Sequence, residues 1–167
     1  MMPKAISFLG AYDSWRNDNK TYWNESILPF QYGMRLICNS PETFPVEFLD
    51  GTAGFYNILN TGKTVLEYQK QVNQFQAKTT AFEINLMGFR CICMNTTEFN
   101  STAFEAVYDE LKHDVMMPFQ FNGEKWRVSL YTTKENIDCS VIAKSMGGGG
   151  HKDAAGFKVG DIREIIS

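Results

Sequence analysis

Four consecutive glycines, Gly147 to Gly150, constrain this chain more than any other stretch of its sequence. Glycine loses more backbone freedom on folding than any other residue. A run of four is therefore costly unless the backbone needs positive φ or another group must come close. The pattern before the run predicts a helix over 138–146, and the pattern after it predicts the first turn of another helix over 151–155. The sequence therefore predicts a loop that joins a helix C-terminus to a helix N-terminus.

Amide groups at such a helix N-terminus point toward whatever lies in front of the loop. Unpaired N–H groups and the helix dipole attract anions there, phosphate above all. The two common phosphate loops do not match this sequence. The P-loop needs Gly-Lys-Ser/Thr after its spacer, and the dinucleotide fingerprint needs a preceding strand and a later acidic residue. A flexible linker, or a tight turn that only packs, is the alternative interpretation of the run.

The glycines belong to a longer pattern, Gly148-Gly149-Gly150-His151-x-x-Ala154-Ala155-Gly156-Phe157. This pattern resembles the signature of the C-terminal, DHH-associated domain of the DHH-family phosphoesterases. The family includes RecJ-type exonucleases, nano-RNases and cyclic-dinucleotide phosphodiesterases. The stretches 126–130 and 137–143 also match in style, as a strand followed by the helix that leads into the glycines. The resemblance covers residues 64–167 well and residues 1–60 only loosely.

The resemblance implies that the glycine run binds substrate. The amides of Gly147, Gly148, Gly149 and Gly150 would hold a phosphate or a nucleotide 3′ end. His151 would be the family's substrate-binding histidine, with a purely structural histidine as the alternative.

The strand before the glycines offers further candidates for substrate contact. Ser129 and Arg127 share one strand face with Tyr131, which stands where many family members have an arginine. Tyrosine stacks on a base but cannot pair bidentately with phosphate. Arg127, or Lys144 in the helix before the glycines, would therefore supply the positive charge.

In the DHH family a separate catalytic domain holds two metal ions, usually manganese, with Asp-His-His and further aspartates. This sequence has no Asp-His-His triplet, and its two histidines are His113 and His151. A two-metal centre needs several carboxylate and imidazole ligands around ions about 4 Å apart. We therefore expect Mn2+ or Mg2+ only in a complete enzyme. Asp13 is the candidate metal ligand, with turn or helix capping as its alternative role. His113, at the end of a predicted helix, has no expected site role.

Composition narrows the kind of partner and the compartment. The 167 residues carry a net charge of −3, so any nucleic-acid contact must be local and the ligand short. None of the four cysteines forms a C-x-x-C pair, which disfavours zinc and fits a reduced cytoplasmic compartment. The sequence has no signal-peptide pattern and no run of about 18 apolar residues, so we expect neither secretion nor a membrane span.

The remaining pattern predicts an α/β (α+β) protein in three parts. Residues 1–62 are expected to form a small helical segment that resembles the end of a DHH catalytic domain or a linker region. After a break at Gly62, residues 63–79 form a connecting helix, and 80–167 form the DHH-associated substrate-binding domain. That domain is expected to hold a mixed sheet of about five strands flanked by helices. The strands are expected at 82–86, 89–95, 115–121, 125–132 and 157–159, and the helices at 101–111, at 138–146 and from 162.

Residues 17–60 are rich in aromatic side chains and contain two predicted helices, near 27–38 and 46–59. Packing, against the second lobe or a catalytic domain, is favoured over a base-stacking platform. Aromatic side chains left exposed by the absence of a catalytic domain would favour a homodimer.

The resemblance implies the substrate-binding lobe of a DHH-family phosphoesterase, an oligoribonuclease-like hydrolase. The expected partners are a short oligoribonucleotide, a dinucleotide or another phosphate ester, and a DHH catalytic domain that carries out metal-dependent hydrolysis. The chain by itself is expected to be inactive. Two other classes stay open: a non-catalytic nucleotide or nucleic-acid binding module, and a subunit that completes a separate catalytic chain in trans.

Overall fold

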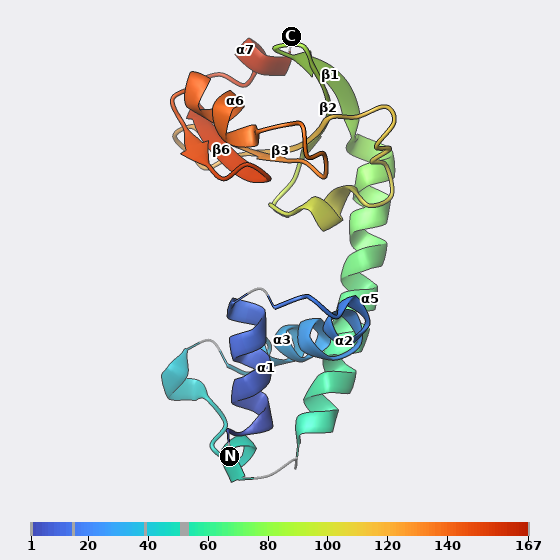
Figure 1. Ribbon diagram of the computed structural model, residues 1–167, viewed down its shortest axis with the longest axis vertical. Helices are drawn as coiled ribbons and strands as arrows, with labels where there is room; N and C mark the ends of the chain where they lie inside the picture. Colours follow the sequence, from blue (N-terminus) through green and yellow to red (C-terminus); the bar gives the residue numbers. More distant parts are fainter. Residues whose placement is uncertain (1, 15, 39, 51–53, 167) are drawn as a thin grey trace. The chain divides into compact units, whose positions relative to one another are not determined.

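The computed structural model describes residues 2–14, 16–38, 40–50 and 54–166 (Figure 1). The chain forms two compact units, residues 1–70 and 71–167, and the long helix α5, Phe55–Thr80, contributes to both. No helix in the described ranges is long and apolar enough to cross a membrane. The division of the chain at residues 62 and 79 stays a prediction.

The N-terminal unit is helical, as predicted. Its elements before α5 are α1 Lys4–Asp13, α2 Lys20–Tyr22, a π-helix Trp23–Ile27, α3 Leu28–Met34, a 3-10 turn Pro41–Thr43 and α4 Glu47–Asp50. The helix predicted near 27–38 is the shorter α3. The one predicted near 46–59 corresponds to α4 and the start of α5, and its residues 51–53 lie outside the described ranges.

Aromatic packing holds this unit together. Phe30 stacks on Phe55 with ring centroids 4.6 Å apart, and Phe8 meets both rings edge-on. Such pairs add to the hydrophobic effect of burying large side chains. The aromatic side chains of this core pack with one another inside their own unit, whereas the sequence predicted packing against the second lobe or a catalytic domain. Tyr22 and Tyr56 are exposed.

The predicted break at Gly62 is wrong, because α5 begins at Phe55 and runs through this residue. An added Cβ on Gly62 would collide with the carbonyl of Pro29 in α3. The glycine therefore permits a close helix crossing. Local helix propensity alone predicts a break at a glycine, and this is why the sequence pattern was misleading here.

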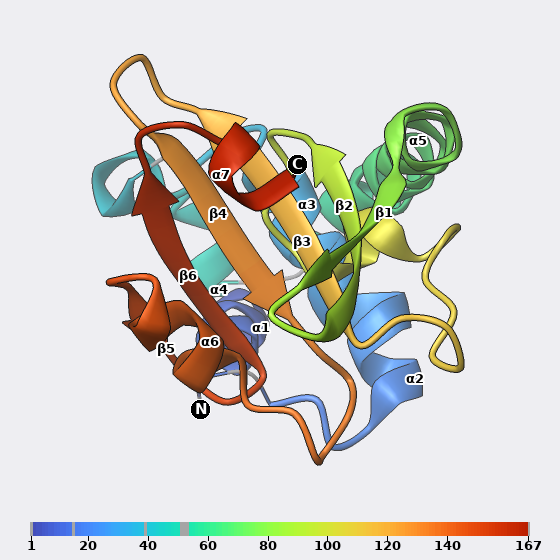
Figure 2. The same ribbon diagram turned by 90° about the horizontal axis from the view of Figure 1, so that it is seen from above.

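The C-terminal unit is built on one six-stranded mixed sheet (Figure 2). Its order is β1-β2-β3-β4-β6-β5, and only the β2–β3 pair is parallel. The strands are β1 Phe82–Leu86, β2 Phe89–Asn95, β3 Val115–Phe121, β4 Trp126–Tyr131, β5 Gly149–Gly150 and β6 Ala154–Val159. The helices α6, Cys139–Ser145, and α7, Arg163–Ile166, complete the unit. The predicted α+β class is confirmed, with six strands in place of about five.

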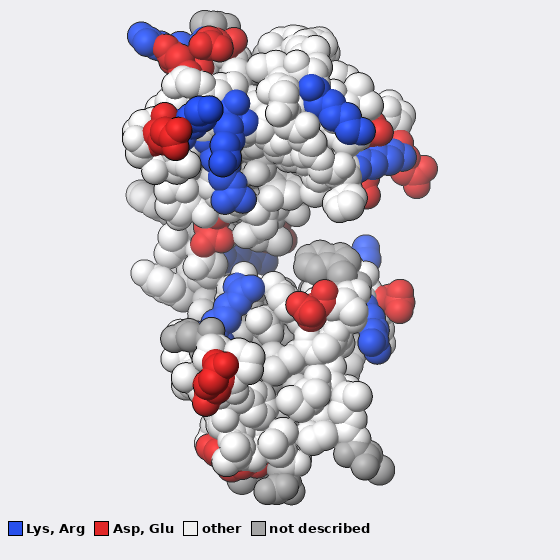
Figure 3. Space-filling model, turned by 90° about the vertical axis from the view of Figure 1, so that its left-hand side faces the viewer, with Lys and Arg blue, Asp and Glu red and all other residues white. Residues whose placement is uncertain are grey.

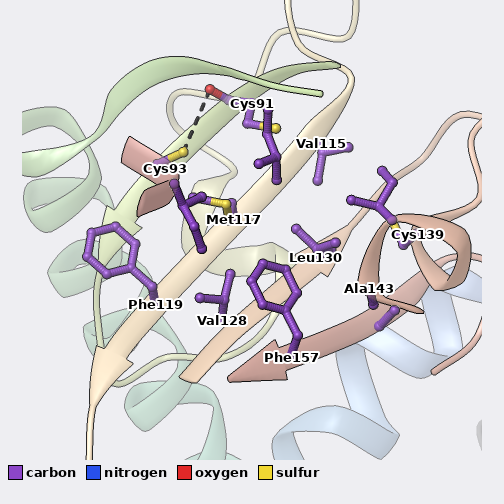
Figure 4. Close-up of a cluster of buried hydrophobic side chains, with 14 of the residues drawn as sticks. Cys91, Cys93, Val115, Met117, Phe119, Val128, Leu130, Cys139, Ala143 and Phe157 are labelled. Atoms are coloured by element: carbon purple, nitrogen blue, oxygen red, sulfur yellow. Dashed lines mark hydrogen bonds between the residues drawn. The ribbon is translucent and has the colours of Figure 1, made fainter. Parts of the chain in front are cut away.

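The two faces of the sheet differ. On the first face Val128, Leu130 and Phe157 pack with α6 in the main core (Figure 4). Cys91 and Cys93 also point into this core, as their alternation predicts, and burial raises the pKa of Cys91 to about 12. The second face carries a smaller core around Ile92, Met94 and Met116, packed with Phe104 and the end of α5. Arg127, Ser129 and Tyr131 belong to this second face, because side chains alternate along a strand.

The helix predicted over 101–111 is wrong. Only a 3-10 turn forms, Ser101–Phe104, capped by the side chain of Asn100. Phe104 is fully buried, but Leu111 is 87% exposed, so the apolar spacing of this stretch does not form one buried helical face. Non-helical turns follow, and the hydroxyl of Tyr108 hydrogen bonds to that of Thr133 at 2.9 Å.

The helix predicted over 151–155 is also wrong. This stretch is the turn of the β5–β6 hairpin and the start of β6, and the amide of His151 donates to the carbonyl of Ala154 at 2.8 Å. Residues 154–156 instead pair with β4 along the sheet. The ladder with β4 satisfies their backbone groups, so the glycine run does not face a helix N-terminus.

Candidate functional site

A pocket of about 650 Å³ lies where the glycine hairpin meets β4 and β6. It belongs entirely to the C-terminal unit. Its walls are made by the glycine run, by one end of the β3–β4 hairpin and by both sheet strands: Lys125, Arg127, Val128, Ser129, Tyr131, Gly147–Gly150 and Ala154–Lys158. The volume is in the usual range for a small-molecule site.

The first two glycines end helix α6. Gly147 has φ +77°, and its amide donates to the carbonyl of Lys144 at 3.0 Å. The amide of Gly148 donates to the carbonyl of Ala143 at 2.8 Å. This pair of bonds is the Schellman arrangement, which satisfies carbonyls that the helix end would leave unpaired. These two amides are therefore engaged with α6 and do not face a ligand.

The last two glycines form strand β5. Hydrogen-bonded pairs alternate along an antiparallel ladder. Because His151 and Ala154 form one such pair, Gly149 and Gly156 form the next, and the amide of Gly150 points away from β6. The hairpin therefore leaves one glycine amide outside these bonds, fewer than the four that the sequence predicted for phosphate.

Gly149 differs from Gly148 and Gly150 because there is room for a side chain at its Cα. An added Cβ on Gly148 would collide with the carbonyl of Gly156, and one on Gly150 would collide with Ala155. An added Cβ on Gly149 would meet no atom within 4 Å, and its φ is not in the left-handed region. Neither packing nor backbone conformation requires glycine at this position, which lines the pocket.

The predicted residues of β4 do meet in the pocket. Ser129 is buried at the floor, and Arg127 lies with its guanidinium 4.3 Å from the ring centroid of Phe99. The hydroxyl of Tyr131 donates to the carbonyl of Phe99 at 2.6 Å, and burial raises the pKa of Tyr131. The Tyr131 hydroxyl is thus engaged with the carbonyl of Phe99, although Tyr131 lines the pocket.

The sequence analysis did not predict two basic residues of the pocket, Lys125 and Lys158. Lys158 lies directly opposite Arg127 across the β4–β6 ladder. Side chains alternate along a strand, so a strand predicted to begin at Ala154 would have placed Lys158 on the same face as Gly156. The predicted strand begins at Phe157 and is too short to show that Lys158 and Gly156 share a face.

The structure leaves three predicted site residues outside the pocket. Lys144, in the last turn of α6, and His151, in the hairpin turn, are exposed and do not line it. Asp13 is the last residue of α1, in the other unit. Across the described ranges no three His, Cys, Asp or Glu side chains are grouped so as to hold a metal ion. The residues present there do not fit the two-metal centre of the DHH family.

Residues 92–166 match the DHHA1 domain family. This part of the chain is a DHHA1 domain. The DHHA1 domain, which is the DHH-associated domain of the DHH family, thus contains β3, β4, β5, β6 and the whole pocket. The chain is also 27% identical over 180 residues to uncharacterized protein R106 of Acanthamoeba polyphaga mimivirus. That match takes in 99% of this chain and 39% of R106, so the chain spans about two fifths of its relative.

Solved structures resemble the fold. The DHH domain of a member of a ribosomal-protein family gives a TM-score of 0.56 at 13% identity, over 92% of this chain and 42% of that one. The pGpG-specific phosphodiesterase PggH from Vibrio cholerae gives 0.47 at 10% identity, over 61% of this chain and 37% of that one. The first likeness supports the fold described above.

Proposed function

We propose that the pocket of the DHHA1 domain binds the phosphate of a nucleotide or short oligonucleotide. The observation that carries this proposal is the charge of the pocket. Its lining has three cations, Lys125, Arg127 and Lys158, and no acidic side chain among its described residues, in a chain of net charge −3. Basic side chains also lie side by side on the surface of the C-terminal unit (Figure 3). A pocket of this charge attracts phosphate.

The shape of the pocket supports close approach of the ligand to the backbone. Gly149 leaves open space in the pocket wall, and Ser129 on the floor has a hydroxyl that can bond a phosphate oxygen. His151 and Lys144, outside the lining, would reach only a ligand that extends beyond the hairpin.

We further propose that this domain is the substrate-binding lobe of a DHH-family phosphoesterase. Metal-dependent hydrolysis would need a DHH catalytic domain with Mn2+ or Mg2+, where the ions would activate water. The described residues do not supply such a metal centre, and this observation favours a second candidate, a nucleotide or nucleic-acid binding module that acts without catalysis or completes another chain in trans. A cytoplasmic location fits the free cysteines. A homodimer fits the exposed Tyr22 and Tyr56.

Calorimetric titration with the dinucleotide pApA tests the binding function. We expect saturable binding that weakens about tenfold or more in Arg127→Met, because a charge-assisted hydrogen bond is lost. Lys112→Met removes the same charge from an exposed position outside the pocket and is expected to bind like the wild type. Equal affinity of Arg127→Met and wild type would contradict the proposed site.

Adding Mn2+ to the same mixture tests the catalytic part. We expect the chain alone to leave pApA intact. Cleavage that disappears in Arg127→Met would show that this chain carries its own active centre.

A further inference from the structure

The turn between β1 and β2 contains a methionine in an unfavourable backbone conformation. Met87 has φ +53° and is the only residue other than glycine with positive φ in the described ranges. Together with Gly88, at φ +90°, it forms the two-residue turn of the β1–β2 hairpin. Positive φ at both central residues is typical of a type I′ turn, which favours asparagine, aspartate or glycine at the first of them. A methionine at this position therefore lowers the stability of the turn.

The side chain of Met87 reaches a residue that is distant in the sequence. Its sulfur lies 3.4 Å from the hydroxyl oxygen of Ser145, the last residue of α6. The Ser145 hydroxyl has one proton, and the carbonyl of Ile142, at 2.7 Å, is its better acceptor. A thioether sulfur accepts hydrogen bonds only weakly. In the reduced protein Met87 and Ser145 are therefore in contact without a strong bond between them.

Met87 is also accessible to a small oxidant, unlike most methionines of the chain. It is 60% exposed, and among the other described methionines only Met2, in the N-terminal unit, is as exposed. The remaining methionines are buried or half-buried: Met34, Met94, Met116, Met117 and Met146. A hydroperoxide that meets the folded C-terminal unit therefore reaches the sulfur of Met87 before the methionine sulfurs of the core.

Oxidation converts the sulfur of Met87 from a weak hydrogen-bond acceptor to a group with a strong one. A hydroperoxide transfers one oxygen atom to the thioether. Its O–O bond breaks, an S=O bond forms, the sulfur loses two electrons, and the peroxide leaves as an alcohol or as water. The sulfoxide oxygen is a polar acceptor, and the hydroxyl of Ser145 is a donor that already contacts the sulfur. Because Met87 is exposed, the added polarity disrupts no core.

We propose that Met87 is a site of reversible oxidation by hydroperoxides, and that its sulfoxide fastens the β1–β2 turn to the end of α6 through Ser145. The effect extends to the start of the glycine run, because the amides of Gly147 and Gly148 bond to carbonyls near the end of this helix. A methionine sulfoxide reductase reverses the change. This inference is independent of the proposed binding of phosphate.

Treatment with hydrogen peroxide followed by peptide mass spectrometry tests the site. We expect Met87 of the native protein to gain one oxygen atom faster than Met94 or Met117, and a methionine sulfoxide reductase to remove it. In urea all three methionines should react at similar rates, because burial no longer protects the core. Oxidation of Met94 or Met117 in native protein as fast as that of Met87 would overturn the site.

Urea unfolding of the oxidised and the reduced protein tests the bond to Ser145. We expect oxidation to raise the folded-to-unfolded ratio about fivefold, the effect of one added hydrogen bond. Met87→Leu, oxidised in the same way, controls for the oxidation of Met2 and should gain nothing. Ser145→Ala should be oxidised at Met87 without any gain. An unchanged or lowered ratio in the oxidised wild type, or an equal gain in Ser145→Ala, would overturn the proposed bond.

Hydrogen exchange measures the effect on α6 directly. The amide of Gly148, bonded to the carbonyl of Ala143 at 2.8 Å, should exchange more slowly in the oxidised protein, because the end of the helix is held more firmly. Oxidised Ser145→Ala should show no such slowing. Equal exchange of Gly148 in the oxidised and reduced wild type would overturn the link between the turn and α6.

Discussion

Gly149 lies directly opposite Gly156 across the β5–β6 ladder, and only one of the two positions sterically requires glycine. An added Cβ on Gly156 would collide with the carbonyl of Val128, so the sheet requires this glycine. The same atom on Gly149 would enter open space in the pocket wall.

Substitution at Gly149 is therefore expected to affect binding and not folding. Gly149→Ala should keep the wild-type urea midpoint or raise it slightly, because alanine narrows the unfolded ensemble. Gly149→Val should weaken pApA binding about tenfold, since its branched side chain fills the pocket. Unfolding curves and calorimetry on the same samples check this. Wild-type affinity in Gly149→Val would show that no ligand approaches the glycine wall.

Gly147→Ala should behave in the opposite way. Its φ of +77° is the left-handed conformation that ends α6, and an L side chain there costs about 1 kcal/mol. We expect the free energy of unfolding to fall by that amount, and the urea midpoint with it, while the folded protein binds pApA normally. Gly149→Ala is the matched control in the same loop. An unchanged midpoint would mean that the Schellman end of α6 is not needed.

Asp114 is expected to make stability depend on acid pH. Hydrogen bonds from Arg90 and an ion pair with Lys134 at 2.7 Å hold the pKa of this carboxyl well below its usual range. Because the folded pKa is lower than the unfolded one, the stabilisation is present above about pH 4 and is lost as pH falls through the lowered pKa. Asp114→Asn should lower the free energy of unfolding at pH 7 by about 1 kcal/mol. It should also make that free energy depend less on pH in the acid range. Denaturation midpoints from pH 7 to pH 2 measure both effects. Parallel profiles for the two proteins would contradict this role.

Thiol reactivity should separate the four cysteines. Cys91, Cys93 and Cys139 are buried and have raised pKa values, to about 12 for Cys91 and Cys139, whereas Cys38 is only half-buried. The thiolate is the reactive form, so the buried thiols should react slowly. A thiol-titrating reagent at pH 8 should label one group quickly in native protein and four in urea. Rapid labelling of a second thiol that is absent in Cys91→Ala would show that the core opens readily.

Local signals in the sequence were enough to predict much of the C-terminal unit. The helix predicted over 138–146 is α6, where the side chain of Asp138 accepts a hydrogen bond from the Ser140 amide. The strands predicted at 82–86, 89–95 and 115–121 are β1, β2 and β3 at their observed bounds. Asn122-Gly123 forms the predicted turn, with φ +97° at the glycine. These features depend on residues close in the chain, so the sequence contains their causes.

The failed predictions share a different physical origin. The sequence predicts helices over 151–155 and 101–111. In the structure Ala154 and Ala155 instead pair with β4, and 101–111 forms only the 3-10 turn Ser101–Phe104, in which Phe104 is buried. Gly62 looked like a helix end because its partner in the crossing, Pro29, is distant in sequence.

The sequence by itself determined that a DHHA1-like glycine run, a capped helix and alternating strands would come together around a candidate phosphate site. Only the tertiary structure decided which groups form that site. Strand register placed Lys158 beside Arg127, the end of α6 and the β5–β6 hairpin together engaged most of the glycine amides, and the fold brought Phe99 against Arg127. Pairing register and long-range contacts are set by the free energy of the whole sheet and core, which no short stretch of sequence contains.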